Sequence, residues 1–253
     1  MQFSRLTNFE KVLDFNEKFG IKVFKEPQLD IFDKEPKLVE LRMNLIREEI
    51  KELEEAVKNK DLVETIDALS DIIYVILGMG CSLGINLNGV SNSEDFNGKF
   101  SINSPTYPKL DIFEKEQNKI ESIMNSIRAK MIHLEQVVKN KNLIEIINCL
   151  PNLLYLIQNL GYYLDINLNL AFNIVHDSNM SKLCRTEEKA KETVYWYEKN
   201  KEKLGYDSPS YRLSEDGEYY VVYNKSTGKI LKSIDYTPAN FDALFGKNMT
   251  NKS

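Results

Sequence analysis

Apolar residues recur at three- and four-residue spacing along most of the chain, which is the period at which an α-helix buries one face. Amphipathic helices bury their apolar stripes against one another, so the expected fold class is all-α, a helix bundle. The pattern predicts helices over Thr7–Phe19, Pro36–Asn59, Asp61–Leu83, Gln117–Lys139, Asn142–Leu164, Asn167–Lys182 and Glu187–Leu204.

The pattern changes in two other stretches. Residues 218–224 (EYYVVYN) and 229–236 (KILKSIDY) are rich in β-branched and aromatic residues and flank KSTG, which predicts a small C-terminal β-hairpin packed on the bundle. Residues 89–107 (GVSNSEDFNGKFSINSPTY) are rich in Ser, Asn, Gly and Pro, and we expect them to form a loop or linker.

The chain contains an internal repeat. Residues 27–88 recur without a gap as residues 108–169 (108 − 27 = 81), with 30 identities in 62 positions. Self-similarity at a fixed offset indicates one supersecondary unit built twice, so we expect two homologous halves that pack as a pseudo-dimer. The predicted domains are 1–90 (N-terminal helix and first repeat), 91–107 (linker), 108–204 (second repeat and the helices after it) and 205–253 (hairpin and tail).

The second half has lost one specific set of acids. Other acids survive at matched positions, for example Glu40 as Glu121, so the loss is selective. Because a fold accepts such changes only where the charge did not hold it together, the comparison predicts a functional site in the first half. Glu48, Glu49, Glu52, Asp67 and Asp71 stand where the second half has Ala129, Lys130, His133, Asn148 and Asn152.

The spacing of these acids suits a metal site. Glu48 and Glu52 share one helix face, and so do Asp67 and Asp71, because residues four apart are neighbours on a helix. Grouped carboxylates repel one another and select a hard cation such as Mg²⁺ or Mn²⁺. The alternative is a solvated acidic face, which EEIKELEEA alone would favour. An Asp pair inside the apolar run of 62–83 argues against it.

Two further residues near this set have alternative explanations. Asp61 and Glu64 have the spacing of a capping box, and the second half keeps it as Asn142 and Glu145. Glu64 is therefore explained at least as well by helix initiation as by metal binding. His133 lies at the position that matches Glu52, and it is explained more readily as a side chain without a specific function than as a metal ligand.

Three segments in order, LIREEIKEL, DALSDIIYVILGMGCSLGI and VHDSNMSKL, resemble the all-α nucleoside triphosphate pyrophosphohydrolases, the MazG-like and phosphoribosyl-ATP pyrophosphohydrolase-like superfamily. The resemblance covers about Phe9 to Lys182 and implies Mg²⁺-dependent cleavage of a nucleoside triphosphate into the monophosphate and pyrophosphate by a metal-activated water. The EExxE motif of that family falls on Glu48, Glu49 and Glu52.

This sequence departs from the family's second motif, ExxD. Taking Asp71 as its Asp leaves Ala68 at the Glu position, whereas taking Asp67 leaves Glu64. The internal comparison selects Asp67 together with Asp71. The predicted metal ligands are thus Glu49, Glu52, Asp67 and Asp71, and the predicted catalytic residues are Glu48 and Glu49.

The segment VHDSNMSK follows only the second half, and the resemblance implies nucleotide contacts there. Asn179 is expected to hydrogen-bond the nucleotide and Lys182 to meet a phosphate, the alternative being a polar helix end. One active site would combine these residues with the metal ligands of the first half. A (deoxy)nucleoside triphosphate, whatever its base, is favoured over phosphoribosyl-ATP as the substrate.

Two rival functions remain open at this point. A carboxylate-bridged di-iron or di-manganese bundle usually needs Glu-x-x-His pairs, and neither His133 nor His176 has a Glu three residues before it. The other rival is a non-catalytic helical interaction module that keeps a metal site.

Composition narrows the cellular setting. The 253 residues carry a net charge of −5 without a basic patch, so no nucleic-acid partner is expected. The N-terminus has no apolar signal segment, and no run approaching the ~18 apolar residues of a membrane span is apparent. We expect a cytoplasmic protein without membrane contact, a monomer as pseudo-dimer or a homodimer. Cys81, Cys149 and Cys184 lack metal-type spacing and are interpreted as buried or free thiols.

Overall fold

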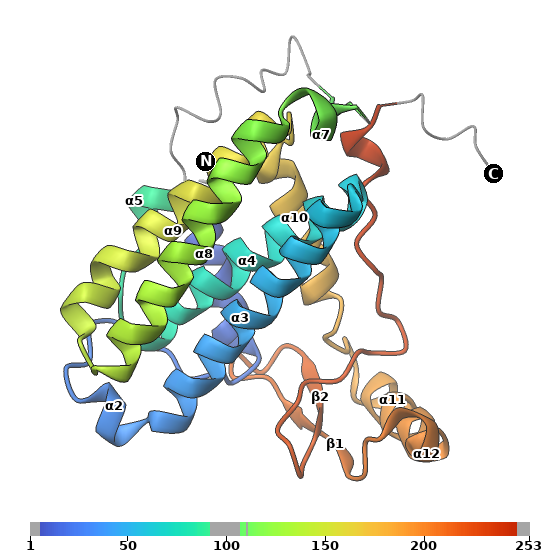
Figure 1. The fold of residues 1–253 in the computed structure, drawn as a ribbon. Helices are drawn as coiled ribbons and strands as arrows, with labels where there is room; N and C mark the ends of the chain where they lie inside the picture. Colours follow the sequence, from blue (N-terminus) through green and yellow to red (C-terminus); the bar gives the residue numbers. More distant parts are fainter. Residues whose placement is uncertain (1–5, 92–106, 110, 247–253) are drawn as a thin grey trace, which may run out of the picture. The chain divides into compact units, whose positions relative to one another are not determined.

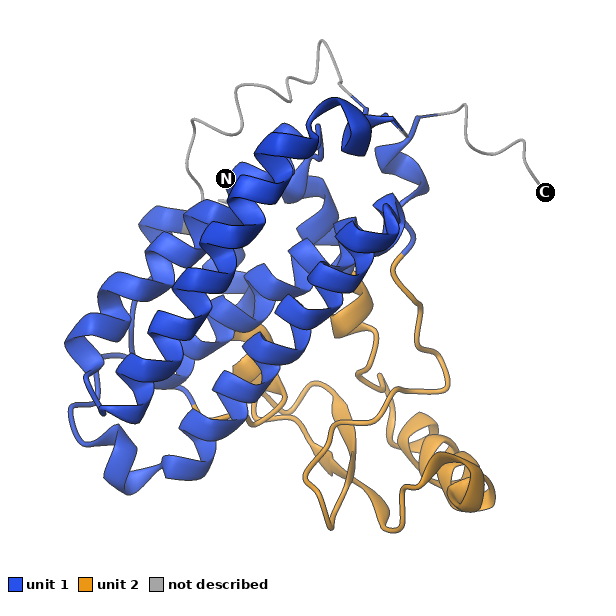
Figure 2. Ribbon diagram, viewed as in Figure 1, with its two compact units in different colours: residues 1–12, 23–175, 240–253 blue, residues 13–22, 176–239 orange. Residues whose placement is uncertain are grey.

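The computed structural model describes residues 6–91, 107–109 and 111–246, and it is mostly helical (Figure 1). The all-α fold class and the small C-terminal hairpin are confirmed. Nearly all of the predicted linker, residues 91–107, lies outside the described residues. The chain divides into two compact units, which Figure 2 colours separately. Unit 1 consists of residues 1–12, 23–175 and 240–253, and unit 2 of residues 13–22 and 176–239.

Four long helices form the core of unit 1 (Figure 1). Helix α3 (Pro36–Asn59) packs on α4 (Leu62–Leu83), and α8 (Gln117–Lys139) packs on α9 (Leu143–Tyr163). The two pairs meet through contacts of α4 with α9 and of α3 with α8. The short flanking elements of unit 1 are α2 (Ile31–Lys34), α5 (Asn88–Ser91), α7 (Ile112–Lys115) and the 3-10 turn η1 (Asp242–Leu244). Helices α1 (Asn8–Lys18) and α10 (Leu168–Met180) begin in unit 1 and end in unit 2.

Local structure repeats at the same offset as the sequence. Helices α2, α3 and α4 recur in order as α7, α8 and α9, shifted by 81 residues (112 − 31 = 81). Left-handed backbone recurs as well, at Lys60 and Lys141 (φ 55° in both) and at Gly84 and Asp165 (φ 75° and 58°). The repeated segments therefore share their turns as well as their helices.

Ion pairs between the two helix pairs are reciprocal. Arg47 Nε lies 2.8 Å from Glu135 Oε1, and Arg128 Nε lies 2.6 Å from Glu54 Oε1. Since Arg128 and Glu135 match Arg47 and Glu54 in the repeat, each half gives the same arginine to the same glutamate of the other. This is the contact pattern of a two-fold arrangement; the duplication itself is inferred from the sequence.

The helix that begins after Asp61 is capped as the sequence predicts, but by Asp61 alone. The Asp61 carboxylate accepts hydrogen bonds from the backbone N–H groups of Val63 and Glu64, both at 3.1 Å. The reciprocal half of the predicted capping box is replaced, because the Asp61 N–H donates to the Ala56 carbonyl at 3.0 Å. The Glu64 side chain is therefore not needed to start α4.

Helices α4 and α9 differ in the fraction of their residues that is buried. Both are long and apolar enough to cross a membrane by length and composition, contrary to the expectation from the sequence. The most apolar stretch of α4 is 83% buried, as in a core helix, and that of α9 is 44% buried. Tyr74 on α4 is 7% exposed and stacks on Phe172, whereas its counterpart Tyr155 is 54% exposed.

Unit 2 combines α11 (Glu187–Lys199), α12 (Lys201–Leu204) and a two-stranded antiparallel sheet. The predicted helix over Glu187–Leu204 is thus interrupted at Asn200. Strand β2 (Tyr220–Asn224) is the predicted one, but its partner is β1 (Pro209–Leu213). The predicted partner, residues 229–236, pairs with β2 only at its start, where the Asn224 N–H donates to the Lys229 carbonyl at 2.9 Å and the Leu231 N–H to the Val222 carbonyl at 2.8 Å. Beyond Leu231 the prediction was wrong, because the N–H groups of Lys232 and Ile234 donate to the side chains of Tyr197 and Thr193 instead.

Apolar clusters and free thiols complete the cores. Phe19 is fully buried with Leu183 and Val221 in unit 2, so the segment 13–22 packs into the C-terminal part of the chain. The three cysteines are free and buried, as the sequence predicts.

Candidate active site

The acids that the second half lacks lie on two helices that pack together. Glu48, Glu49 and Glu52 are on α3, and Asp67 and Asp71 are on α4. Glu48 and Glu52 are exposed, whereas Glu49, Asp67 and Asp71 are half-buried. The antiparallel packing of α3 and α4 follows from the short connection at residues 60–61, which lets the two apolar faces meet.

The charges of these acids converge on Glu49. Burial raises the pKa of the Glu49 carboxyl to about 8, and the carboxylates of Asp71, Glu52, Glu48 and Asp67 raise it as well, in that order. The surroundings of Glu49 thus contain all four of the other acids that the sequence comparison selected. A carboxyl group in such surroundings favours a bound proton or a bound cation.

Glu64 belongs to the same electrostatic group. Burial raises the pKa of the Asp67 carboxyl, and the carboxylates of Glu64 and Glu52 raise it further. The sequence interpretation ranked Glu64 second because it resembled a capping residue, a contact that the Asp61 N–H instead makes with Ala56. The sequence signal for Glu64 was the ExxD spacing of Glu64 and Asp67. This signal was not used, because Asp67 was selected together with Asp71.

These residues fit a hard cation by the chemistry of their donor atoms. Every donor is a carboxylate oxygen, as Mg²⁺ prefers. Among the described residues, no three His, Cys, Asp or Glu side chains lie close enough to hold a metal ion as they stand. Ligation by these carboxylates would therefore require rotation of the long Glu side chains. The assignment of Glu49, Glu52, Asp67 and Asp71 as ligands stays a prediction.

The matched face of the second half has the opposite character. Lys130 replaces Glu49 and is half-buried, and its ammonium opposes the rise that burial causes in the pKa of the Cys149 thiol. The Asn152 side chain donates to the Asn148 carbonyl at 2.6 Å, a bond within its own helix. Among the five positions that match the first-half acids, no carboxylate remains.

The two predicted nucleotide-binding residues lie in unit 2. Asn179 is in the last turn of α10 and Lys182 is just after it, and both are half-buried. The Lys182 ammonium donates to the Asn179 Oδ1 atom at 2.6 Å. The structure therefore brings these two side chains together, and their roles toward a nucleotide stay predictions.

Residues 12–93 match the family model described as phosphoribosyl-ATP pyrophosphohydrolase. The domain formed by residues 12–93 belongs to the MazG-like all-α nucleoside triphosphate pyrophosphohydrolase superfamily. The matched region ends before the second half and contains the six acids of the candidate site, Glu48, Glu49, Glu52, Glu64, Asp67 and Asp71. Membership in this superfamily implies pyrophosphohydrolase-type activity, and its members typically depend on a divalent metal.

A relative matches the chain over nearly its full length. The chain is 36% identical over 250 residues to an uncharacterized protein of Acanthamoeba polyphaga mimivirus, covering 95% of this chain and 96% of the relative. The two proteins therefore form one family across both units. No solved structure matches the chain significantly.

Proposed function

We propose that the chain hydrolyses a (deoxy)nucleoside triphosphate to the monophosphate and pyrophosphate, with Mg²⁺ held by the first-half carboxylates. The observation that carries the proposal is the convergence of four carboxylates on the half-buried Glu49, whose pKa is raised to about 8 by burial and by these carboxylates. The family match of residues 12–93 supports the same class of reaction.

Each acid has a distinct part in this proposal. Glu49, Glu52, Asp67 and Asp71 hold the metal, with Glu64 placed beside Asp67 as a further oxygen donor. A bound Mg²⁺ would activate a water molecule and neutralise charge on the phosphates. Glu48 is exposed beside Glu49 and accepts a proton from the attacking water. Mn²⁺ is the natural substitute because it takes the same oxygen ligands.

Residues of unit 2 would bind the substrate. Lys182 supplies a positive charge for a phosphate, and Asn179 supplies an amide that can donate to and accept from the nucleotide. These two residues already form one polar pair, which limits the conformations they can adopt.

A second candidate substrate is phosphoribosyl-ATP, because the matched family model carries that description. Both candidates are nucleotides that release pyrophosphate, so they share the metal site and differ in the part that binds the rest of the substrate. The test must therefore include both.

The test is a pyrophosphate-release assay on the four common deoxynucleoside triphosphates, the ribonucleoside triphosphates and phosphoribosyl-ATP, with Mg²⁺ present. Wild-type protein should release pyrophosphate from at least one of them, and Glu49→Gln should not. Lys130→Gln, at the matched position of the second half, should turn over at the wild-type rate within a few-fold. No release from any of these nucleotides, or equal rates for Glu49→Gln and wild type, contradicts the proposal.

A further inference from the structure

Unit 2 contains a pocket of about 450 Å³ that belongs to neither the carboxylate cluster nor the Asn179–Lys182 pair. One side is formed by residues directly around that pair, and the other by the segment that follows β2. Its polar lining consists of Asp177, Ser181, Arg185, Tyr219, Asp235 and Thr237. A volume of roughly 300–1,000 Å³ is usual for pockets that bind small molecules.

The two sides of the pocket are joined by hydrogen bonds. Ser181 Oγ accepts from the Thr237 N–H at 2.9 Å and donates to the Ser178 carbonyl at 2.7 Å. Ser178 Oγ in turn lies 3.1 Å from the Tyr236 hydroxyl. The end of α10 and residues 236–237 are therefore fixed to each other at the pocket wall.

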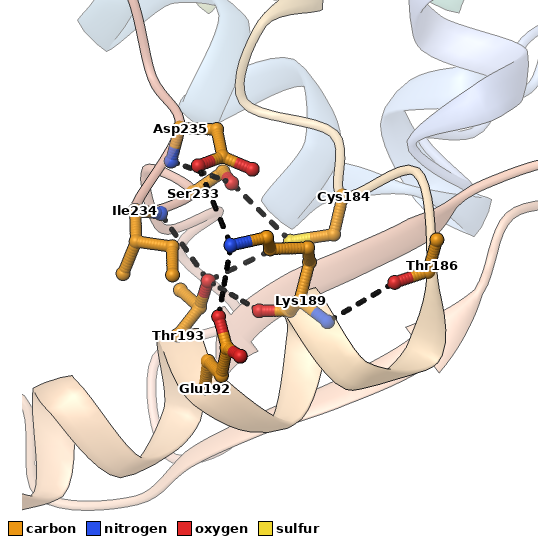
Figure 3. A network of polar contacts seen from close by, with 8 residues as sticks. All are labelled: Cys184, Thr186, Lys189, Glu192, Thr193, Ser233, Ile234 and Asp235. Carbon is orange, nitrogen blue, oxygen red and sulfur yellow. Dashed lines mark hydrogen bonds and ion pairs between the residues drawn. The ribbon is translucent and has the colours of Figure 1, made fainter.

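A second network holds the wall near Asp235 (Figure 3). The Thr193 hydroxyl accepts from the Ile234 N–H at 3.2 Å and donates to the Lys189 carbonyl at 2.8 Å. The Cys184 thiol lies 3.4 Å from Ser233 Oγ, which also accepts from the Asp235 N–H at 3.1 Å. Because buried side chains support the wall in this way, the pocket is preformed.

The pocket lining has one apolar side and one polar side. Met180, Leu183 and the Tyr219 ring belong to the apolar cluster of unit 2. Arg185 and Asp177 are exposed, and within the described residues neither the guanidinium nor the carboxylate makes a hydrogen bond or ion pair. Both groups are free to bind a ligand at no cost in existing contacts.

The charges decide which part of a nucleotide fits. The lining carries the carboxylates of Asp177 and Asp235 and the guanidinium of Arg185, and the Lys189 ammonium lies 3.9 Å from Asp235, so the pocket has no excess of positive charge to hold a triphosphate chain. A neutral nucleoside offers an aromatic base for the Tyr219 side and base edges and sugar hydroxyls for the acids and the arginine. We infer that this pocket binds the nucleoside part of a nucleotide; the choice of a nucleotide rests on the proposed function.

The test measures binding of the four common deoxynucleosides to the whole chain by isothermal titration and NMR, without metal. Wild type should bind at least one of them, and Arg185→Ala and Asp177→Ala should each weaken binding about tenfold or more, the scale of one lost hydrogen bond to a charged group. Lys225→Ala, an exposed residue of unit 2 away from the lining, should leave binding unchanged. Thermal midpoints confirm that the variants are folded.

The inference and the proposed function can fail separately. Glu49→Gln should stop pyrophosphate release and leave nucleoside binding as in wild type. Wild-type protein that binds no deoxynucleoside at millimolar concentration, or pocket variants that bind as well as wild type, would overturn the inference whatever the turnover. Loss of nucleoside binding in the pocket variants of a protein without turnover would support the pocket and reject the proposed function.

Discussion

Replacing Glu49 with Gln should make the metal-free protein more stable at alkaline pH while it removes activity. Burial and the surrounding carboxylates raise the pKa of Glu49 from 4.5 to about 8, so the folded protein resists losing this proton. At about 1.4 kcal/mol for each pH unit, that difference sets an upper limit of about 5 kcal/mol on the destabilisation. Solvent reaches this half-buried side chain, and screening reduces the expected value to about 1–2 kcal/mol.

The sign depends on pH in a defined way. Below pH 4.5 the carboxyl is protonated in both the folded and the unfolded protein, and its contribution is fully present. As the pH rises toward about 8 the unfolded chain loses the proton first, so stability is lost across this window. Gln keeps the shape of Glu without a charge, and its advantage should therefore be near zero at pH 4.5 and largest above pH 8.

Urea unfolding followed by circular dichroism, with a chelator present, measures this difference. The free energy of unfolding of Glu49→Gln should exceed that of wild type by about 1–2 kcal/mol at pH 8.5, the full screened penalty, and match it at pH 4.5. Lys130→Gln, at the matched second-half position, should show no such gain. A Glu49→Gln protein that is less stable than wild type at pH 8.5 would refute the electrostatic reasoning.

Three further predictions follow from the site and the repeat. Mg²⁺ affinity, measured by calorimetry, should rise up to about tenfold per pH unit below pH 8, because binding displaces one proton from the carboxylate cluster; affinity that is independent of pH contradicts this. Asp71→Asn should lower turnover on the order of 10²-fold, whereas Asn152→Asp should keep it within a few-fold in the same steady-state assay. Gly84→Ala should destabilise the fold by about 3 kcal/mol, because its Cβ would lie 1.8 Å from the Glu26 carbonyl oxygen. Asp165→Gly, at the matched left-handed turn, should be neutral or stabilising by denaturant unfolding.

The long helices could be predicted from the sequence because their signals are local. Pro36 at the first helical turn and the apolar period fix α3 at Pro36–Asn59, as predicted. The cap at Asp61 was predicted for the same reason. The full pairing of β2 with β1 could not be predicted, because β1 and residues 229–236 both lie close to β2 in sequence. How far each one pairs depends on tertiary contacts of α11, such as the one between Thr193 and Ile234.

The internal repeat extends into residues 89–107, which were interpreted as a linker because of their composition. DFNEKFGI at 14–21 recurs as DFNGKFSI at 95–102 (95 − 14 = 81), with six of eight residues identical. In the first copy Phe19 is buried in unit 2 and the Phe19 carbonyl accepts from Arg212 at 2.6 Å. The polar residues around the second copy made it resemble a linker, and it lies outside the described residues.

The candidate site was predictable only in part, for a physical reason. The loss of five acids between the halves identifies positions where charge is dispensable for folding, which selected Glu49 and its neighbours. Glu64 escaped this comparison because the second half keeps Glu145 at its position. Its proximity to Asp67 is a property of the folded helix, and only the structure reveals that its capping contact is absent.

Phosphorus NMR of a reaction mixture tests the central claim most directly. The wild-type protein is incubated with Mg²⁺ and the nucleoside triphosphate that it turns over fastest, and the first products are followed in time. The proposed function predicts that the nucleoside monophosphate and pyrophosphate appear together from the start. The nucleoside diphosphate with orthophosphate as the first products would contradict it.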